Sequence, residues 1–362
     1  MSVSTGTTGT TGTTGTTGTT GTTLQLAIRK LAAGESLSAD EAQGAFELVM
    51  AGEATPVQVS ALLIGLRVKG ETAAEVAGVV QAMRAAMVRL PAESPDDLVD
   101  TCGTGGGAVQ TFNVSTAAAL LAAGAGLRIA KHGNRSFTSL CGSADVLEAL
   151  GVKIDVPVAT MEQALRDAGI VFMFAPLMHP AMRHVGPVRR ELGIPTVMNI
   201  VGPLANPAMA GRQVVGVAED RRVPLIAGAL QALGTRHALV VHGTGMDEIS
   251  PLAPTHVIEI RDGKTTTWTV DPTRFGYEGL DAKDLAGGPP EANARAVLDV
   301  LGGDSTTAAR GAVVLNAGAA LYVGGRAKTF EQGVEMAEAA LEQRVGLGAL
   351  ERLRTAFRSA PQ

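Results

Sequence analysis

The sequence predicts an α/β protein in which a small N-terminal all-helical domain precedes a larger domain with a mostly parallel central sheet flanked by helices. Up to about residue 94, helical periodicity is broken by cap residues and glycines; beyond Pro95, short apolar runs alternate with loops and helical segments. The second pattern is typical of parallel strands joined by helices. A length of 362 residues with 46% hydrophobic content suits two domains, or one large domain with an appendage, and a substantial core.

The first 23 residues differ from the rest of the chain. Thr5 to Thr23 is a Gly-Thr-Thr repeat with essentially no apolar side chains. Such a segment cannot bury enough surface to offset the entropy lost on ordering, so residues 1–23 are expected to be a disordered tail.

Four helices are expected in the small domain, near 24–33, 39–51, 56–68 and 73–87. Ser38 with Glu41, and Thr72 with Glu75, form capping boxes at the starts of the second and fourth helices. Pro56 follows Thr55 at the first helical position of the third. Prolines near residues 91 and 95 indicate a linker.

The larger domain begins with two strand–loop–helix units. The first has a strand in 96–102, a glycine-rich loop and a helix over 115–126 capped by Asn113 or Ser115. The second has a strand over 127–132, a loop and a helix over 143–151 capped by Ser143. Apolar segments continue the series at 170–175, 213–218, 237–243, 255–260 and 311–323.

Residues 179–193, "HPAMRHVGPVRRELG", indicate a turn and a helix outside the sheet. We expect this segment to return to the N-terminal helices. The small domain would then comprise 24–94 with about 179–195, and the α/β domain 95–178 and 196–362.

Composition restricts the class of protein. The formal net charge of −5 disfavours nucleic-acid binding through a broad basic face. Cys102 and Cys141 have no metal-site or disulfide-framework spacing. No apolar run reaches the roughly 18 residues of a membrane helix, and no secretory signal is evident at the N-terminus. We therefore expect a cytoplasmic protein that binds neither membranes nor nucleic acid.

The glycine loop is the first candidate site. Four glycines fall within Gly103–Gly107, and the order Gly-x-Gly-x-x-Ala fits a loose dinucleotide pattern. That pattern also requires an acidic residue about 20 positions later, yet none occurs between Thr101 and Ala144. A Walker loop is excluded because no Gly-Lys-Ser/Thr ends the loop. Two interpretations remain: a phosphate site made of backbone amides at a helix N-terminus, or a glycine-rich turn that only packs.

The next loop, "KHGNRSFTS" (131–139), favours an anion site. Loops at the carboxyl ends of adjacent parallel strands face one crevice. Lys131 and Arg135 would supply charge there, and hydroxyls would supply directional hydrogen bonds. These hydroxyls belong to Ser136, Thr138, Ser139 and Ser143.

Two further groups of side chains could complete the site. Asp247 and Glu248 follow a strand at the same sheet edge and, with the Ser115 hydroxyl, could bind Mg²⁺, although an acidic turn is often only solvated. An arginine of the 179–193 segment could pair with a substrate carboxylate, although an exposed basic helix face is equally compatible with the pattern. No Ser-His-Asp triad or Cys-His pair is indicated.

Five ordered motifs give the chain a family resemblance: "GTGG" with "TFNVST", "KHGNRS", "FAP" with "HPAMRHVGPVRRELG", "NIVGPLANP" and "VVHGTGMDEIS". In this order they resemble the anthranilate phosphoribosyltransferases of tryptophan biosynthesis, from about Leu24 to the C-terminus. The resemblance implies transfer of the phosphoribosyl group of phosphoribosyl pyrophosphate (PRPP) to the amino group of anthranilate. It also implies a fold like that of pyrimidine nucleoside phosphorylases, a homodimer, and two Mg²⁺ ions per active site.

The resemblance also assigns site residues. For PRPP these are Gly103, Gly106, Gly107, Thr111, Asn113, Val114, Ser115 and Thr116, followed by Lys131, His132, Gly133, Asn134, Arg135, Ser136, Phe137, Thr138, Ser139 and Ser143. For anthranilate they are Gly103, Asn134 and Arg189. For the metal they are Ser115, Asp247 and Glu248.

One departure and two alternatives accompany the resemblance. The family loop usually ends in Asp where this chain has Gly107, so any role of that carboxylate is absent here. No residue is expected to act as an acid or base; Lys131 and Arg135 would instead stabilise the pyrophosphate leaving group. The alternatives are a phosphorylase on the same fold and a non-catalytic paralogue that binds nucleic acid.

Overall fold

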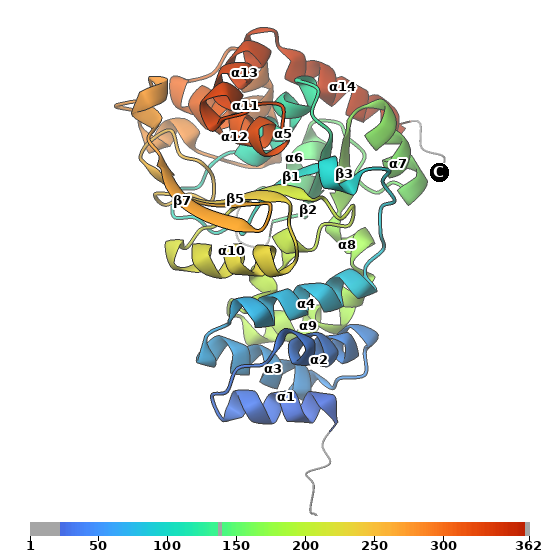
Figure 1. Cartoon of the computed structure of the whole chain (residues 1–362). Coiled ribbons are helices and arrows are strands. Elements are labelled where there is room, and N and C mark those ends of the chain that lie inside the picture. Colours follow the sequence, from blue (N-terminus) through green and yellow to red (C-terminus); the bar gives the residue numbers. More distant parts are fainter. Residues whose placement is uncertain (1–21, 137–139, 359–362) are drawn as a thin grey trace, which may run out of the picture.

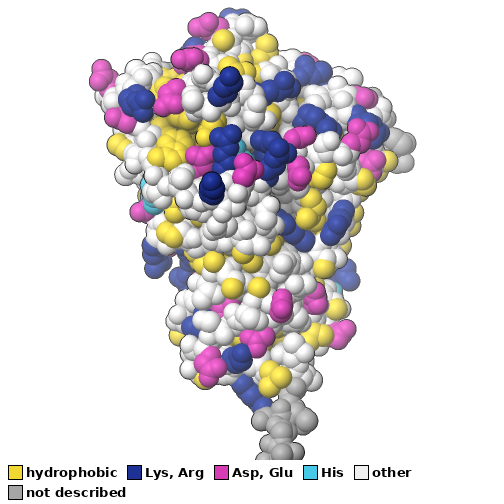
Figure 2. Space-filling view, in the orientation of Figure 1, with side chains coloured by type: hydrophobic (Ala, Val, Ile, Leu, Met, Phe, Trp, Pro, Cys, Tyr) yellow, Lys and Arg dark blue, Asp and Glu magenta, His cyan; other side chains and the backbone are white. Residues whose placement is uncertain are grey.

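The computed structural model describes residues 22–136 and 140–358, and Figure 1 shows a helical unit at one end of a larger α/β unit. The tail expected over residues 1–23 lies almost entirely outside the described residues. On the face seen in Figure 2, basic and acidic side chains are interspersed over the α/β unit. None of the described helices is both long and apolar enough to cross a bilayer.

The helical unit contains the four helices predicted from the sequence: α1 (Thr23–Ala32), α2 (Ala39–Ala51), α3 (Pro56–Lys69) and α4 (Ala73–Ala86). Both predicted capping boxes are present, since the Ser38 and Thr72 hydroxyls accept the backbone N–H of Glu41 and Glu75. Local chemistry therefore determines these helix starts.

The segment after residue 178 forms a 3₁₀ turn (Pro180–His184) and helix α9 (Gly186–Leu192). The turn contacts α2, and α9 contacts α3. Val188 of α9 belongs to the same apolar cluster as Leu62 and Leu63 of α3. The sequence-predicted turn and helix thus lie against the N-terminal helices, as Figure 1 also shows.

The central sheet has the order β3-β2-β1-β4-β5-β6-β7. Its strands are β1 (Val99–Gly103), β2 (Ile129–Gly133), β3 (Ile170–Phe174), β4 (Arg212–Gly216), β5 (His237–Gly243), β6 (Thr255–Arg261) and β7 (Lys264–Val270). The first five in spatial order are parallel, and β6 and β7 are antiparallel additions at one edge. The prediction of a mostly parallel sheet is confirmed, but β7 was missed because its Lys-Thr-rich sequence is largely exposed.

Helices cover both faces of the sheet (Figure 1). One apolar cluster joins one face of the sheet to α5 (Val114–Gly124), α6 (Ser143–Ala149), α7 (Val158–Asp167), α11 (Pro290–Gly302), α12 (Thr307–Val323), α13 (Phe330–Glu342) and α14 (Val345–Arg358). Of these helices α5, α7, α12 and α14 contact the strands, and α11 and α13 pack on other helices. The other face packs on α10 (Val223–Ala232), which in turn contacts α4. A second apolar cluster therefore runs from the helical unit through Ile226 of α10 to Val215 and Val240 in the sheet. The short helix α8 (Ala175–Met178) follows β3.

Three local expectations were wrong. Residues 311–323, grouped with the sheet segments, lie within helix α12, because an apolar run of this length suits a buried helix better than a strand. Helix α6 is capped by Gly142, not by Ser143, which is its first helical residue. Asn113 does occupy the cap position of α5, but its side chain makes no capping hydrogen bond.

Glu75 should hold the helical unit together. Its fully buried carboxylate accepts the backbone N–H groups of Leu37 (2.9 Å) and Thr72 (2.8 Å), and the Lys69 ammonium (2.9 Å). Glu75→Ala would leave the Leu37 and Thr72 N–H groups without an acceptor and remove the counter-charge of the Lys69 ammonium, which keeps its contacts with Ser36 and Gly70. We expect the free energy of unfolding to fall by about 3 kcal/mol. Equilibrium denaturation measures this loss. The exposed Glu47→Ala should change stability by less than about 0.5 kcal/mol, and equal losses in both variants would contradict the assignment.

Candidate active site

The carboxyl ends of β1, β2 and β5 bring three loops to one edge of the sheet. The Val109 N–H donates to the Gly245 carbonyl (2.9 Å), which joins the loop after β1 to the turn after β5. The Asn113 amide contacts the Cys141 carbonyl (3.3 Å), which joins the first loop to the loop after β2. Strand β1 lies between β2 and β4, where the strand order reverses, and ligands of such sheets bind at this position.

Asp247 lies over the paired ends of β1 and β4. Gly103 and Gly216 are register partners. A Cβ on Gly103 would approach the Asp247 carboxylate to 2.3 Å, and one on Gly216 would approach the Asp247 carbonyl oxygen to 1.5 Å. The Gly105 N–H, in a loop with φ of 67°, donates to Asp247 Oδ2 at 2.7 Å. Both strand ends must therefore be glycine for this carboxylate to reach the loop amide.

Gly107, where the family usually has Asp, also lies close to this turn. A Cβ at position 107 would be 2.8 Å from the Gly245 carbonyl oxygen and 3.3 Å from Met246 Cα. Both atoms are backbone and cannot rotate away. In this chain the absence of a side chain at Gly107 allows the glycine loop to contact the 245–247 turn directly.

Glu248 carries an unsatisfied oxygen. Its Oε1 accepts the Thr111 hydroxyl at 3.5 Å, whereas Oε2 is buried without a hydrogen-bond partner among the described residues. Burial raises the pKa of Glu248 well above its usual range, and the neighbouring Asp247 raises it further. Burial likewise raises the pKa of Asp247, although the Gly105 N–H opposes this. The two half-buried carboxylates thus lie side by side at a cost that a bound cation would relieve.

These groups fit a magnesium ion. A small cavity beside the carboxylates has a polar side, formed by Thr101, Ser115, Asp247, Glu248 and Asn316, and an apolar side that includes Ala118, Val214 and Val241. The polar side supplies hard oxygen atoms. Within 22–136 and 140–358 no cluster of three or more His, Cys, Asp or Glu could hold a metal by itself. Mg²⁺ commonly takes one or two carboxylates and completes its shell with substrate phosphates and water. The donor set therefore suits a cation that arrives with an anionic substrate.

Lys131 is buried beneath the glycine loop. Its ammonium donates to the Thr101 carbonyl (2.5 Å) and the Ser115 hydroxyl (3.3 Å). Burial lowers the pKa of Lys131, and the nearby Asp100 carboxylate opposes that shift. Lys131 thus places positive charge beside the first turn of α5.

Asp100 is the buried counter-charge. It accepts the His132 N–H (3.2 Å) and the Asn206 side-chain amide (2.7 Å). Burial raises the pKa of Asp100 to about 6, although Lys131 lowers it. The prediction of site residues omitted Asp100, Asn206 and Gly216. Asn206 lies within the quoted motif "NIVGPLANP", and Asp100 lies three residues before "GTGG"; these motifs were the available signal.

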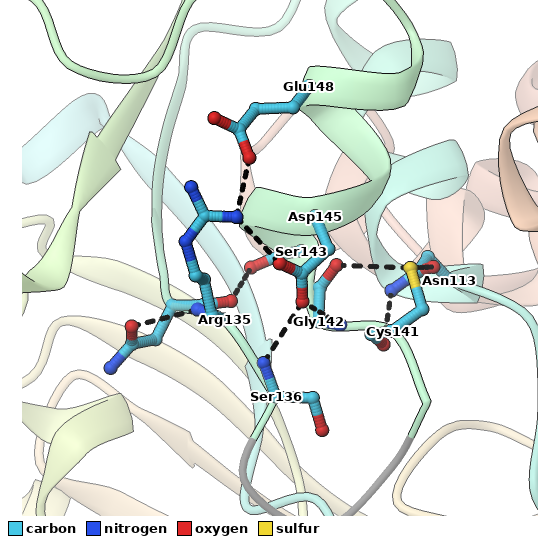
Figure 3. A network of polar contacts seen from close by, with 9 residues as sticks. Asn113, Arg135, Ser136, Cys141, Gly142, Ser143, Asp145 and Glu148 are labelled. Atoms are coloured by element: carbon cyan, nitrogen blue, oxygen red, sulfur yellow. Dashed lines mark hydrogen bonds and ion pairs between the residues drawn. The ribbon is translucent and has the colours of Figure 1, made fainter. Parts of the chain in front are cut away.

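Arg135 is paired with acidic side chains of α6 (Figure 3). Its guanidinium contacts the carboxylates of Glu148 (2.5 Å) and Asp145 (2.8 Å), which raise its pKa further. Asp145 also accepts the N–H groups of Ser136 and Gly142. The Ser143 hydroxyl donates to the Asn134 carbonyl (3.3 Å). These contacts fold the loop onto α6, and the predicted site residues Phe137, Thr138 and Ser139 lie outside the described residues.

His132 and His179 form a buried pair whose ring centroids are 5.0 Å apart. Burial lowers the pKa of His132 to about 3 and that of His179 to about 4. The Nε2 atoms of both rings have no partner among the described residues. Both rings are therefore neutral near pH 7 and can donate or accept a hydrogen bond without carrying charge.

Arg189 is a half-buried cation on α9. Burial lowers its pKa, and within the described part of the chain its guanidinium makes no ion pair or hydrogen bond. The adjacent Arg190 is exposed. Arg189 is thus available to an anionic group.

The structure brings part of the predicted site together. Gly103, Gly107, Thr111, Ser115 and Lys131 lie around the carboxylates of Asp247 and Glu248. Gly106 lies in the exposed part of the glycine loop with φ of 84°. Val114 and Thr116 are buried in the first turn of α5. Gly133 packs against Ser143, and Arg135 points to α6 instead of the carboxylate pair.

Comparison with known proteins gives the class first. Residues 25–87 match the family model described as the helical bundle domain of a glycosyl transferase family, and residues 95–344 match the model of its a/b domain. The chain is therefore a glycosyltransferase of this two-part type.

Relatives specify the family. The anthranilate phosphoribosyltransferase of Rubrobacter xylanophilus is 51% identical over 330 residues, covering 91% of this chain and 96% of the relative. The crystal structure of the Thermus thermophilus enzyme is 40% identical with a TM-score of 0.87, covering 92% and 99% of the two chains. The Saccharomyces cerevisiae enzyme in complex with PRPP and Mg is 28% identical with a TM-score of 0.83, covering 93% and 98%. This chain belongs to the anthranilate phosphoribosyltransferase family.

Gly107→Ala tests the contact between the loops. The new Cβ, 2.8 Å from the Gly245 carbonyl oxygen, should push the glycine loop away and weaken the Gly105–Asp247 hydrogen bond. We expect amide exchange at Gly105 to accelerate and the free energy of unfolding to fall by about 1–3 kcal/mol. Gly44→Ala, whose Cβ would meet only Thr23 Cγ2 at 3.4 Å, should leave exchange at Gly105 unchanged. Unaltered exchange in Gly107→Ala would refute the contact.

Proposed function

We propose that this chain transfers the phosphoribosyl group of PRPP to the amino nitrogen of anthranilate, giving N-(5-phosphoribosyl)anthranilate and pyrophosphate. The observation that carries the proposal is the half-buried Asp247–Glu248 pair, which lies beside the glycine loop and the Lys131 ammonium at one sheet edge. The Saccharomyces cerevisiae relative was solved with PRPP and Mg and, separately, with 4-fluoroanthranilate. Those ligands are the donor substrate and the metal that this site would take, and an analogue of its acceptor.

PRPP would bind along the glycine loop, the start of α5 and the loop after β2. Exposed loop amides at Gly106 and Gly107 would donate to phosphate oxygens. The Lys131 ammonium would add charge next to Ser115, with which it already shares a 3.3 Å contact. Arg135 would contribute after exchanging its α6 carboxylates for a phosphate. The remaining donor-binding residues are Gly103, Thr111, Asn113, Val114, Thr116, His132, Gly133, Asn134, Ser136, Phe137, Thr138, Ser139 and Ser143.

Mg²⁺, two ions per site, would be held by Asp247, Glu248, the Ser115 hydroxyl and the oxygens of PRPP. The support for this metal site is Glu248 Oε2, which is buried without a donor among the described residues. When bound, the metal would supply positive charge to the pyrophosphate as it departs.

Anthranilate would bind between this edge and α9. Arg189 has no protein partner among the described residues, and guanidinium suits bidentate contact with a carboxylate. Asn134 and Gly103, at the ends of β2 and β1, would complete the acceptor site.

The residues then act by position and charge. The bond between the ribose anomeric carbon and the pyrophosphate oxygen breaks as the bond to the anthranilate nitrogen forms. Lys131 and the loop amides stabilise the negative charge on the leaving group. The amino nitrogen is a neutral nucleophile, so no strong base is required; the proton that nitrogen loses after the bond forms passes to the departing pyrophosphate or to water. Holding both substrates in line supplies several kcal/mol of the barrier reduction, on the order of what positioning gives elsewhere.

The domain assignment is also part of the proposal: residues 24–94 with about 179–195 form one domain, and 95–178 with 196–362 the other. Closure of the first onto the second would bring α9 to the donor site. A homodimer formed through the helical unit is supported by exposed apolar side chains on α3 and α1: Val57 is 78% exposed, Val68 81% and Leu26 45%. We place the enzyme in the cytoplasm, which suits its two free cysteines.

The direct test mixes purified protein, PRPP, Mg²⁺ and anthranilate, and follows the loss of anthranilate fluorescence together with pyrophosphate release. We expect both signals to change in equal molar amounts. A folded protein that gives neither signal refutes the proposal. Cleavage of a nucleoside by inorganic phosphate would instead support the phosphorylase alternative.

Arg189→Ala should raise the KM for anthranilate by about tenfold or more, because a hydrogen bond to a charged group contributes about 1.5–3 kcal/mol. The KM for PRPP should stay within about twofold of the wild-type value. Arg190→Ala, on the same helix but exposed, serves as the matched control. An unchanged anthranilate KM in Arg189→Ala would exclude Arg189 from the acceptor site.

Glu248→Gln keeps the size of the side chain and its contact with Thr111 but removes the charge. We expect the Mg²⁺ concentration that gives half-maximal turnover to rise by about tenfold or more, since Mg²⁺ prefers carboxylate to amide oxygen. Steady-state titration with Mg²⁺ measures this. The exposed Glu278→Gln should titrate like wild type, and identical curves for all three proteins would show that Glu248 does not bind the metal.

A further inference from the structure

A short segment more than 170 residues further along the chain, residues 285–288, lies against the glycine loop. The Phe112 N–H donates to the Leu285 carbonyl (2.9 Å), and the Gly287 N–H donates to the Gln110 carbonyl (3.1 Å). Thr111 and Ala286 form an antiparallel bridge. Residues 285–288, which we call the strap, thus pair with the last part of the loop like a strand.

The strap approaches closely because it contains glycine. A Cβ on Gly287 would lie 2.4 Å from the Thr111 carbonyl oxygen. The strap leads directly into α11, where Asn293 is only 3% exposed. Asn293 Oδ1 accepts the Gly288 N–H at 2.7 Å, which fixes one end of its amide.

The other end of the Asn293 amide contacts the predicted donor site. Asn293 Nδ2 donates to Asn113 Oδ1 at 2.9 Å. The Cys141 thiol donates to the same oxygen, and Asn113 Nδ2 donates to the Cys141 carbonyl, both at 3.3 Å (Figure 3). Burial raises the pKa of Cys141 to about 11, so the thiol keeps the proton that it donates. All three contacts require the same orientation of the Asn113 amide.

We propose that Asn293 is a positioning residue that sets the orientation of Asn113, so that Asn113 presents an N–H donor, not an oxygen, to the donor substrate. An amide nitrogen carries two N–H groups, and among the described residues only one N–H of Asn113 is used. The other is preorganised for an oxygen of the ribose or a phosphate, as effective binding groups are. This inference rests on the proposed function and assigns a role to a residue outside the loops that bind the substrates.

Asn293→Asp tests the inference by replacing one heavy atom, the amide nitrogen, with oxygen. The carboxylate can still accept the Gly288 N–H, but it has no N–H to donate and meets Asn113 Oδ1 with a second acceptor. The Asn113 amide must turn to donate to Asp, which moves its oxygen to where its nitrogen was. We expect the KM for PRPP to rise about tenfold and the KM for anthranilate to change by less than about twofold.

Two further variants separate positioning from a general structural effect. Gln110→Glu adds the same charge beside the strap on an exposed side chain whose backbone alone makes the strap contact, and it should keep the wild-type KM for PRPP. In Asn113→Ala the group to be positioned is gone, so adding Asn293→Asp should raise the PRPP KM no further. Independent, multiplying effects of the two substitutions would overturn the inference, as would an unchanged KM in Asn293→Asp.

A substrate-free measurement keeps this inference distinct from the proposed function. In protein labelled with ¹⁵N at asparagine, the Asn113 side-chain resonances are assigned from their loss in Asn113→Ala. We expect them to shift in Asn293→Asp and to remain in place in Gln110→Glu. No shift overturns the positioning role whatever the enzyme does. A shift in a protein that does not convert PRPP and anthranilate supports the positioning role while the proposed function fails.

Discussion

The site depends on one close approach, that of Asp247 to the ends of β1 and β4. Two glycines in register, Gly103 and Gly216, leave the space that the Asp247 backbone and carboxylate occupy. The Gly105 N–H then fixes that carboxylate at 2.7 Å. Because β5 ends next to β4, Glu248, which follows Asp247, lies at the same edge of the sheet. Its carboxylate is next to the Asp247 carboxylate, and two like charges so close are unfavourable without a cation. The register of the sheet thus places two carboxylates together, and a bound metal ion would relieve their repulsion.

The sequence was sufficient where the determining chemistry is local. Capping boxes at Ser38 and Thr72 placed two helix starts, and short apolar strands with glycine-rich loops indicated the parallel sheet and the edge where its loops meet. The Asp247–Glu248 pair and the basic loop were predicted to meet at this edge because each follows a recognisable strand. In a parallel sheet, the loop that follows each strand lies at the carboxyl edge, so loops that follow strands in the sequence are expected to meet there.

The features that were missed depend on partners far away in the chain. Arg135 was expected to be available to a phosphate, but Asp145 and Glu148 bind it on a helix that the charge pattern alone could not orient. Asn206 reaches Asp100 across 106 positions, and Asn293 reaches Asn113 across 180. Strand β7 was not predicted because its exposed, Thr-rich sequence lacks the apolar pattern of the central strands. Pairings of this kind are set by tertiary packing and leave no periodic signal.

The position of helix α9 affects how the acceptor site of this enzyme could vary by substitution. Its Arg189 pairs with no carboxylate among the described residues, while Val188 of the same helix is part of the core of the helical unit. Of the groups proposed for the acceptor, Gly103 and Asn134 lie on the same sheet loops as the groups proposed for the sugar phosphate, whereas the cation, Arg189, lies on a helix anchored elsewhere. Substitutions on α9 would thus alter the charged contact to the acceptor while the glycine loop, Lys131 and the carboxylate pair stay intact.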